Sequence, residues 1–149
     1  KKVLETLSSR CIKFNISLSN NQNLEIANNL LNGKLDEIIN KDLINYYLTP
    51  GNIYNLILFA QKNNYDLLNL DLRNFLKILI KNNHYKKSEK IKYLIFEFIE
   101  YYFSKNDLKI SKELFTQYNY FIKRISDTKR YNLDEDSLFL EFDERILNG

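Results

Sequence analysis

The sequence predicts a mainly α-helical protein. Its 149 residues include only 3 glycines and 1 proline, too few breakers for a sheet protein rich in turns. Apolar residues make up 44% of the chain, and after residue 18 they recur at the three- and four-residue spacing of amphipathic helices. The 10 Phe and 11 Tyr supply enough bulk for a real core, which excludes global disorder.

One short segment near the start departs from the helical spacing. From Cys11 to Leu18, the apolar residues Ile12, Phe14 and Ile16 alternate with polar ones, as in a half-buried strand. The chain also lacks methionine and begins in mid-pattern, so we expect further residues upstream.

Helices are expected from there to residue 66. Ser19 or Asn20 can cap a helix that ends at Gly33, and a shorter helical stretch covers Leu35 to Tyr47. A third helix starts at Thr49-Pro50-Gly51, because threonine caps well and proline fits the first helical position.

That third helix should end near Asn63. The polar run from Asn63 to Asp66 then indicates a break, which we take as a boundary between two small domains.

The second half predicts a bundle of four helices with broad apolar faces. Their expected starts are Asp71, Ser88, Ser111 and the turn from Asn132 to Asp134. Acidic residues fill the first turn of the last helix, where the helix dipole favours them.

Composition excludes several classes of function. The single Cys and single His, Cys11 and His84, cannot hold a metal, and Glu97 with Glu100 lacks partners for one. One cysteine permits no internal disulfide and fits the cytoplasm, and no apolar run is long enough to span a membrane. No glycine-rich loop is present to cradle phosphates, so we expect no cofactor bound by this chain alone.

Two surface features keep alternative interpretations open. A basic cluster is either a solvated loop or a contact for DNA phosphates, although the net charge of +3 does not favour nucleic acid. Aromatic stripes are core residues first and an oligomer interface second. The cluster comprises Lys77, Lys81, Lys86, Lys87, Lys90 and Lys92, and the stripes comprise Tyr93, Phe96, Tyr101, Phe103, Tyr118, Tyr120 and Phe121.

Arg10 has two interpretations from its residue type alone. An arginine just before a strand is usually a surface ion-pair residue. Its planar and permanently charged guanidinium could instead reach a neighbouring subunit and stabilise a transferring γ-phosphoryl group.

Three motifs give the chain a family resemblance. The run from Val3 to Phe14, with Ser9-Arg10-Cys11 at its centre, resembles the segment that ends the base domain in bacterial AAA+ clamp-loader subunits of DNA polymerase III. Thr49-Pro50-Gly51-Asn52 is similar to the Ser-Pro-Gly-Arg turn that opens their sensor helix. Asn132-Leu133-Asp134, followed by Phe142, resembles a motif of their final helix.

The resemblance implies a fold and a role. Residues 1–17 would end the AAA+ base domain, residues 18–66 would form a helical lid, and residues 67–149 would form a helical collar for pentamer assembly. Arg10 would be an arginine finger supplied in trans, with Ser9 and Cys11 as structural motif residues. Partners would be gamma or tau and delta subunits, the sliding clamp and primed DNA, with ATP bound by the neighbouring subunits.

Differences between this sequence and the family motifs help to choose between the types of clamp-loader subunit. Asn52 stands where ATP-binding relatives carry an arginine, which favours the delta-prime type over the gamma or tau ATPase. Glu5 replaces a proline before Thr6, so the loop that carries Arg10 has less rigidity. The rival classes are a gamma or tau ATPase subunit, an unrelated helical interaction module, and a helical DNA-binding module.

Overall fold

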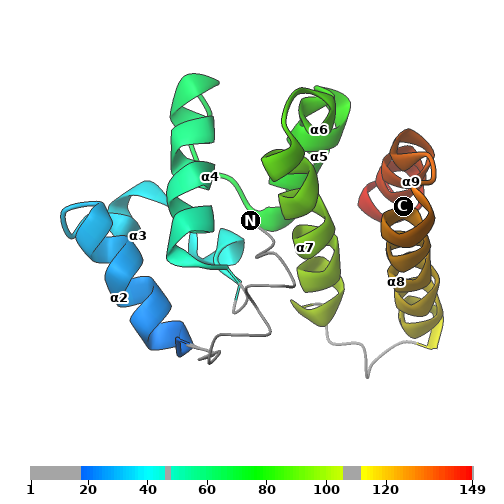
Figure 1. The fold of residues 1–149 in the computed structure, drawn as a ribbon, viewed down its shortest axis with the longest axis horizontal. Coiled ribbons are helices and arrows are strands. Elements are labelled where there is room, and N and C mark those ends of the chain that lie inside the picture. Colours follow the sequence, from blue (N-terminus) through cyan, green and yellow to red (C-terminus); the bar gives the residue numbers. More distant parts are fainter. Residues whose placement is uncertain (1–17, 46–47, 106–111, 149) are drawn as a thin grey trace, which may run out of the picture.

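The computed structural model describes residues 18–45, 48–105 and 112–148. Every regular element in these ranges is a helix, so the prediction of a mainly α protein is confirmed (Figure 1). In chain order they are α2 (Asn20–Leu30), α3 (Leu35–Ile38), the 3-10 helix η1 (Lys41–Leu43), α4 (Pro50–Lys62), α5 (Leu72–Lys81), α6 (His84–Lys87), α7 (Glu89–Lys105), α8 (Lys112–Tyr131), α9 (Glu135–Phe142) and the π-helix η2 (Asp143–Leu147). The predicted strand lies outside the described residues except for Leu18.

The helices stand side by side in a row. In Figure 1, α2 and α3 lie at one end, α4 and α7 in the middle, and α8 and α9 at the other end. A hydrophobic core runs through the row, from Ala27 and Leu56 to Ile95 and Phe142.

The predicted helix starts are confirmed where the structure describes them. Ser19 forms a capping box with Gln22 at the start of α2. The hydroxyl of Thr49 accepts the Asn52 N–H at the start of α4, and Asp71 accepts the Asn74 N–H at the start of α5. These side chains satisfy N–H groups that the first helical turn leaves without carbonyl partners. The predicted start of α8 at Ser111 lies outside the described residues.

Four of the described helices are followed by an asparagine with a left-handed backbone. Asn32, Asn64, Asn83 and Asn132 follow α2, α4, α5 and α8, and each has a positive φ between 52° and 56°. Asparagine tolerates this left-handed backbone better than most residues with a side chain. Gly33 follows Asn32 with a φ of 80°, which fits its predicted role in stopping α2.

The single helical stretch predicted from Leu35 to Tyr47 is wrong. The α-helix ends at Ile38, and Ile39 is extended with φ −132° and ψ 136°. Asn40 then accepts the Asp42 N–H and starts η1. Burial explains why the α-helix does not continue, because the extended backbone at Ile39 leaves this residue only 1% exposed and η1 buries Leu43 completely.

Among the described residues of the second half, α6 is a helix that was not predicted. The segment expected to be a loop before Ser88 forms α6, which carries His84 and Tyr85 into the interior at 5% exposure each. At the other end, α9 continues as η2, whereas one uninterrupted helix was predicted.

Contacts cross the predicted boundary at residues 63–66. The Tyr65 hydroxyl lies 2.8 Å from His84 Nε2, and Asn82 donates to the same hydroxyl at 3.0 Å. Burial, with a smaller contribution from Lys87, lowers the pKa of His84, so the imidazole is neutral at pH 7. The break in helix structure is confirmed by the turn at Asn64, while the division into a lid and a collar stays a prediction.

We expect Arg73→Gln to destabilise the chain by about 1 kcal/mol. The Arg73 guanidinium donates to the Leu147 carbonyl through Nε at 3.0 Å and Nη2 at 2.6 Å, which holds η2 against α5. Urea unfolding monitored by circular dichroism measures the loss. Lys81→Gln, at the exposed end of α5, is the matched control and should change stability little. Equal stability of both variants would show that this clamp contributes nothing.

Candidate functional site

The residues predicted from sequence to act chemically are Ser9, Arg10 and Cys11. All three lie outside the described residues. His84, the single histidine of the chain, is buried against Phe59 and Tyr65, with its ring edge-on to Phe59 at 4.9 Å between centroids. These ring contacts account for the burial of His84, so its position requires no catalytic role.

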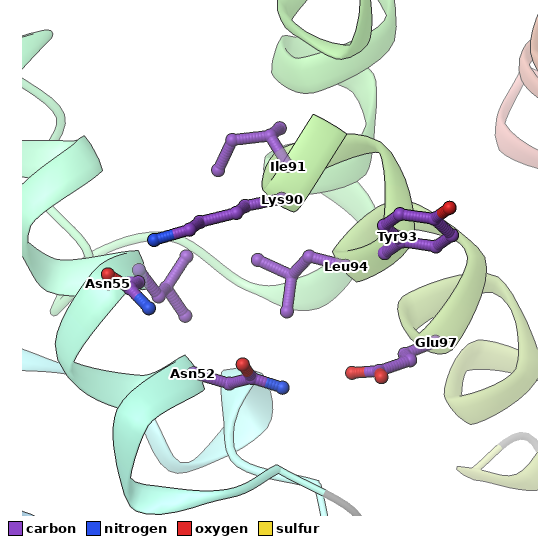
Figure 2. A pocket seen from close by; sticks show the side chains of 8 residues that line it. Asn52, Asn55, Lys90, Ile91, Tyr93, Leu94 and Glu97 are labelled. Atoms are coloured by element: carbon purple, nitrogen blue, oxygen red, sulfur yellow. The ribbon is translucent and has the colours of Figure 1, made fainter. Parts of the chain in front are cut away.

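A cavity of about 160 Å³ lies between α4 and α7 and is the candidate site (Figure 2). We call it the Glu97 cavity. Polar and apolar side chains share its lining, which comprises Asn52, Asn55 and Leu56 from α4 and Lys90, Ile91, Tyr93, Leu94 and Glu97 from α7.

The sequence positions these side chains through helical spacing. Asn52 and Asn55 lie three residues apart on α4, next to the core residues Ile53 and Leu56. The cap by Thr49 fixes the first turn of α4, from which Asn52 projects. Residues at this spacing share one face of a helix, so both amides border the seam between α4 and α7.

On α7 the corresponding stripe is Lys90, Leu94 and Glu97, spaced by four and three residues. Leu94 is buried and separates the two charged side chains. Figure 2 shows Lys90 extending towards Asn55, while the Glu97 carboxylate points towards Asn52. The two charges therefore occupy different parts of the cavity.

Glu97 is the electrostatically unusual group of the site. Its Oε2 is buried and has no hydrogen-bond partner among the described residues. Burial raises the pKa of Glu97, the charge of Lys129 lowers it, and the charge of Glu100 raises it. The dominant cause is the loss of water around the carboxylate, which disfavours its charged form.

Lys129 does not complete a pair with Glu97. Its ammonium lies 3.8 Å from Glu100 Oε1 and 4.9 Å from the centre of the Phe96 ring. From the sequence, Glu97 stands out only as one of two carboxylates that are too few to hold a metal. One feature of the sequence could have identified it. Glu97 lies three residues after Leu94, on the same face of α7, where the helical pattern expects an apolar side chain or a long one whose charge reaches solvent.

The Asn132-Leu133-Asp134 motif forms the turn before α9. Both carboxylate oxygens of Asp134 accept helix N–H groups, from Asp136 at 3.2 Å and Ser137 at 3.1 Å. This confirms the predicted start of the last helix. Leu133 is 50% exposed, so the motif serves as a surface turn in this chain.

Two lysines of the basic cluster are paired with acidic residues of that same turn region. Lys92 lies 3.0 Å from Glu135, and Lys86 forms an ion pair with Asp136. These contacts join the start of α7 and α6 to α9. They offset part of the positive charge that a DNA contact would need.

The aromatic stripes divide between core and surface. Phe96, Phe103 and Phe121 are buried, as predicted for core residues, whereas Tyr93 is 54% and Tyr120 is 38% exposed. Tyr120 is held at the surface by a hydrogen bond of 2.8 Å to Glu141 on α9.

The described part of the chain contains no cluster of three or more His, Cys, Asp or Glu side chains that could hold a metal ion. No helix within it has both the length and the apolar character needed to cross a membrane. Comparisons of the chain with protein-family models, with curated proteins and with solved structures found no match.

Proposed function

We propose that the chain is part of a bacterial clamp-loader subunit of the delta-prime type, which helps to load the sliding clamp onto primed DNA. The observation that carries this proposal is the agreement at two motif turns. Thr49 caps α4 with proline at its first turn, and Asp134 caps α9. The first turn opens a helix, as the family resemblance expects, and the second begins the last α-helix of the described residues.

Under this proposal, each part of the chain has its own role. Residues 1–17 end an AAA+ base domain and carry Arg10, residues 18–66 act as a lid, and residues 67–149 act as a collar. The all-helical character of the described residues in the last two parts supports this assignment. The protein would work in the cytoplasm with gamma or tau and delta subunits.

Asn52 supports the delta-prime type within this proposal. It sits in the first turn of α4, where its amide is electrically neutral and borders the Glu97 cavity. A neutral amide cannot offset phosphate charge as an arginine does. ATP would therefore be bound and hydrolysed by the neighbouring gamma or tau subunit, with Arg10 completing that site.

The observations give the DNA-binding alternative less support. Lys86 and Lys92 are engaged by Asp136 and Glu135, which leaves Lys77, Lys81, Lys87 and Lys90 of the predicted cluster. Pairing reduces the number of phosphate contacts available and so the salt dependence that direct DNA binding would show.

Assembly with clamp-loader partners tests the proposal. The protein, extended by its upstream residues, should co-elute with gamma or tau and delta subunits of the same bacterium in gel filtration. We expect the complex to load a sliding clamp onto primed DNA when ATP is supplied. An interaction module of another class would elute separately from these subunits, and persistent separation at micromolar concentrations would overturn the proposal.

A further inference from the structure

We propose that the hydrogen bond between Tyr65 and His84 is an acid-sensitive latch. It holds the turn after α4 against α6 while the His84 ring is neutral, and it opens when that ring is protonated. The inference is independent of the clamp-loader proposal, because it rests on contacts among the described residues alone.

A chain of two hydrogen bonds forms the latch. Asn82 Nδ2 donates to the Tyr65 hydroxyl at 3.0 Å, and the same hydroxyl lies 2.8 Å from His84 Nε2. A hydroxyl carries one hydrogen, which it can direct to Nε2 while its oxygen accepts from Asn82. Nε2 accepts only when it carries no hydrogen, so this arrangement requires the neutral ring with its hydrogen on Nδ1.

Protonation of Nε2 removes this acceptor. The ring nitrogen then becomes a donor, and the hydroxyl hydrogen must turn away from it. None of the described residues accepts that hydrogen in another direction, because the hydroxyl makes its hydrogen bonds with Asn82 and His84. The contact between Tyr65 and His84 is therefore weaker when the ring is charged.

The surroundings of His84 also oppose its charge. The residue is 5% exposed, and its ring stands edge-on to Phe59 at 4.9 Å and to Tyr65 at 5.7 Å between centroids. Burial lowers the pKa of His84, and the positive charge of Lys87 on α6 lowers it further. Tyr65 is the titratable group in contact with the ring, and no charged side chain of α4, α5 or α7, as the structure describes them, contributes to the lowered pKa.

The latch lies at a seam between two groups of helices. Among the described residues, the most extensive packing of helix pairs occurs between α2 and α4 on one side and among α5 to η2 on the other. The Glu97 cavity, of about 160 Å³, lies along this seam between α4 and α7. The ion pair of Asp42 with Lys105, at 2.7 Å, is another contact across it. Because packing across the seam is less extensive, loss of the latch should loosen the seam before either group unfolds.

Helix α6 has a separate anchor in the second group. Tyr85 is also 5% exposed, and its ring centroid lies 4.7 Å from that of Phe139 on α9. Its hydroxyl donates to Asn83 Oδ1 at 3.1 Å. Burial is the main cause that raises the pKa of Tyr85 to about 12, so this group stays neutral in acid. Opening of the latch therefore frees the side of the seam that carries Phe59 and Tyr65, while α6 stays packed against α9.

The direction of the pH response follows from the two states of the latch. In the open latch His84 has its ordinary pKa of about 6.5, whereas in the closed latch its pKa is lower. The open state therefore binds more protons below about pH 6.5, and acid favours it. The ratio of closed to open molecules should fall as the pH drops from about 6.5 to the lowered pKa, and it should be constant above that range.

Nuclear magnetic resonance of the 149-residue chain, from about pH 7.5 to about pH 4.5, tests the latch. The backbone N–H of Tyr65 donates to the Ala60 carbonyl at 2.9 Å and reports the turn, while the buried Ile95 and Phe98 of α7 report the second group. We expect the hydrogen-exchange protection of Tyr65, corrected for the intrinsic effect of pH, to fall as His84 is protonated. Ile95 and Phe98 should stay protected. Nitrogen chemical shifts should place the hydrogen of the neutral His84 ring on Nδ1.

Three variants assign the response to the latch. His84→Gln keeps a hydrogen-bond acceptor that cannot be protonated in this range, so the pH response at residue 65 should disappear. Tyr65→Phe keeps the ring and loses the hydroxyl, so protection of the turn should already be lower at neutral pH and should change less with pH. Burial raises the pKa of Glu97, so Glu97→Gln is the matched control and should leave the response unchanged. The circular dichroism spectrum checks that each variant is folded.

Three results would overturn the proposal. The first is a corrected protection of Tyr65 that is the same at both ends of the pH range. The second is an unchanged response in folded Tyr65→Phe or in folded His84→Gln, or its disappearance in Glu97→Gln. The third is a loss of protection at Ile95 and Phe98 together with Tyr65, which would mean that acid unfolds the whole chain and opens no local contact first.

Discussion

Phe103→Ala is expected to lower the free energy of unfolding by about 3–5 kcal/mol. Phe103 lies on α7, is completely buried, and brings three helices together through its ring. The ring centroids of Tyr118 and Phe121 on α8 lie 5.8 and 6.0 Å away, and that of Phe142 on α9 lies 5.9 Å away. Truncation leaves a cavity among aromatic side chains that cannot move together to fill it.

Urea unfolding followed by circular dichroism measures this effect. Phe115→Ala is the matched control, because the same substitution on α8 removes a ring that is 50% exposed. Its cost should stay below about 1 kcal/mol. Similar losses for both variants would mean that the packing of α7 against α8 and α9 is not the main source of stability in this half.

The helix starts were predictable because their causes are local. Ser19, Thr49, Asp71 and Asp134 each accept an N–H within three residues, so the sequence window that caps a helix also contains the capped group. The same locality made the starts of α2, α4, α5 and α9 independent of how the helices pack.

The failures of prediction have distant causes. The backbone N–H of Asn40 donates to the Leu67 carbonyl at 3.0 Å, a contact made after the chain has passed through α4. The segment around His84 folds into α6, where His84 shares a hydrogen bond with Tyr65, which precedes α5. Apolar spacing cannot reveal such partners, so the pattern predicted a continuous helix in one case and a loop in the other.

The candidate site was unpredictable for the same reason. The surroundings of Glu97 include residues of α4, a helix distant in the sequence. The spacing of residues within α7 therefore cannot show that Glu97 Oε2 is buried without a hydrogen-bond donor. The family motifs gave a different kind of information. They predicted a helix opening at Thr49, which the structure confirms, and they assign chemistry only to Arg10.

Arg10→Ala is the second change for which we expect a large effect. Under the proposed function, the Arg10 guanidinium reaches the ATP of a neighbouring motor subunit and stabilises charge on the γ-phosphoryl group. Arginine fingers of this kind accelerate nucleotide hydrolysis by about 10³-fold or more. ATP turnover at the neighbouring site should fall by about that factor. Turnover of the whole loader should fall by the fraction of its ATP hydrolysis that this site contributes.

Assembly and side-chain chemistry separate this role from a structural one. Arg10→Ala should leave co-elution with the partner subunits unchanged, because the proposal assigns assembly to the collar. Arg10→Lys keeps the charge but loses the planar fork, so it should restore only part of the turnover. Lys13→Ala removes a nearby positive charge and should leave turnover unchanged. Full turnover by an assembled Arg10→Ala loader would contradict the finger and return Arg10 to the surface ion pair that its residue type alone suggests.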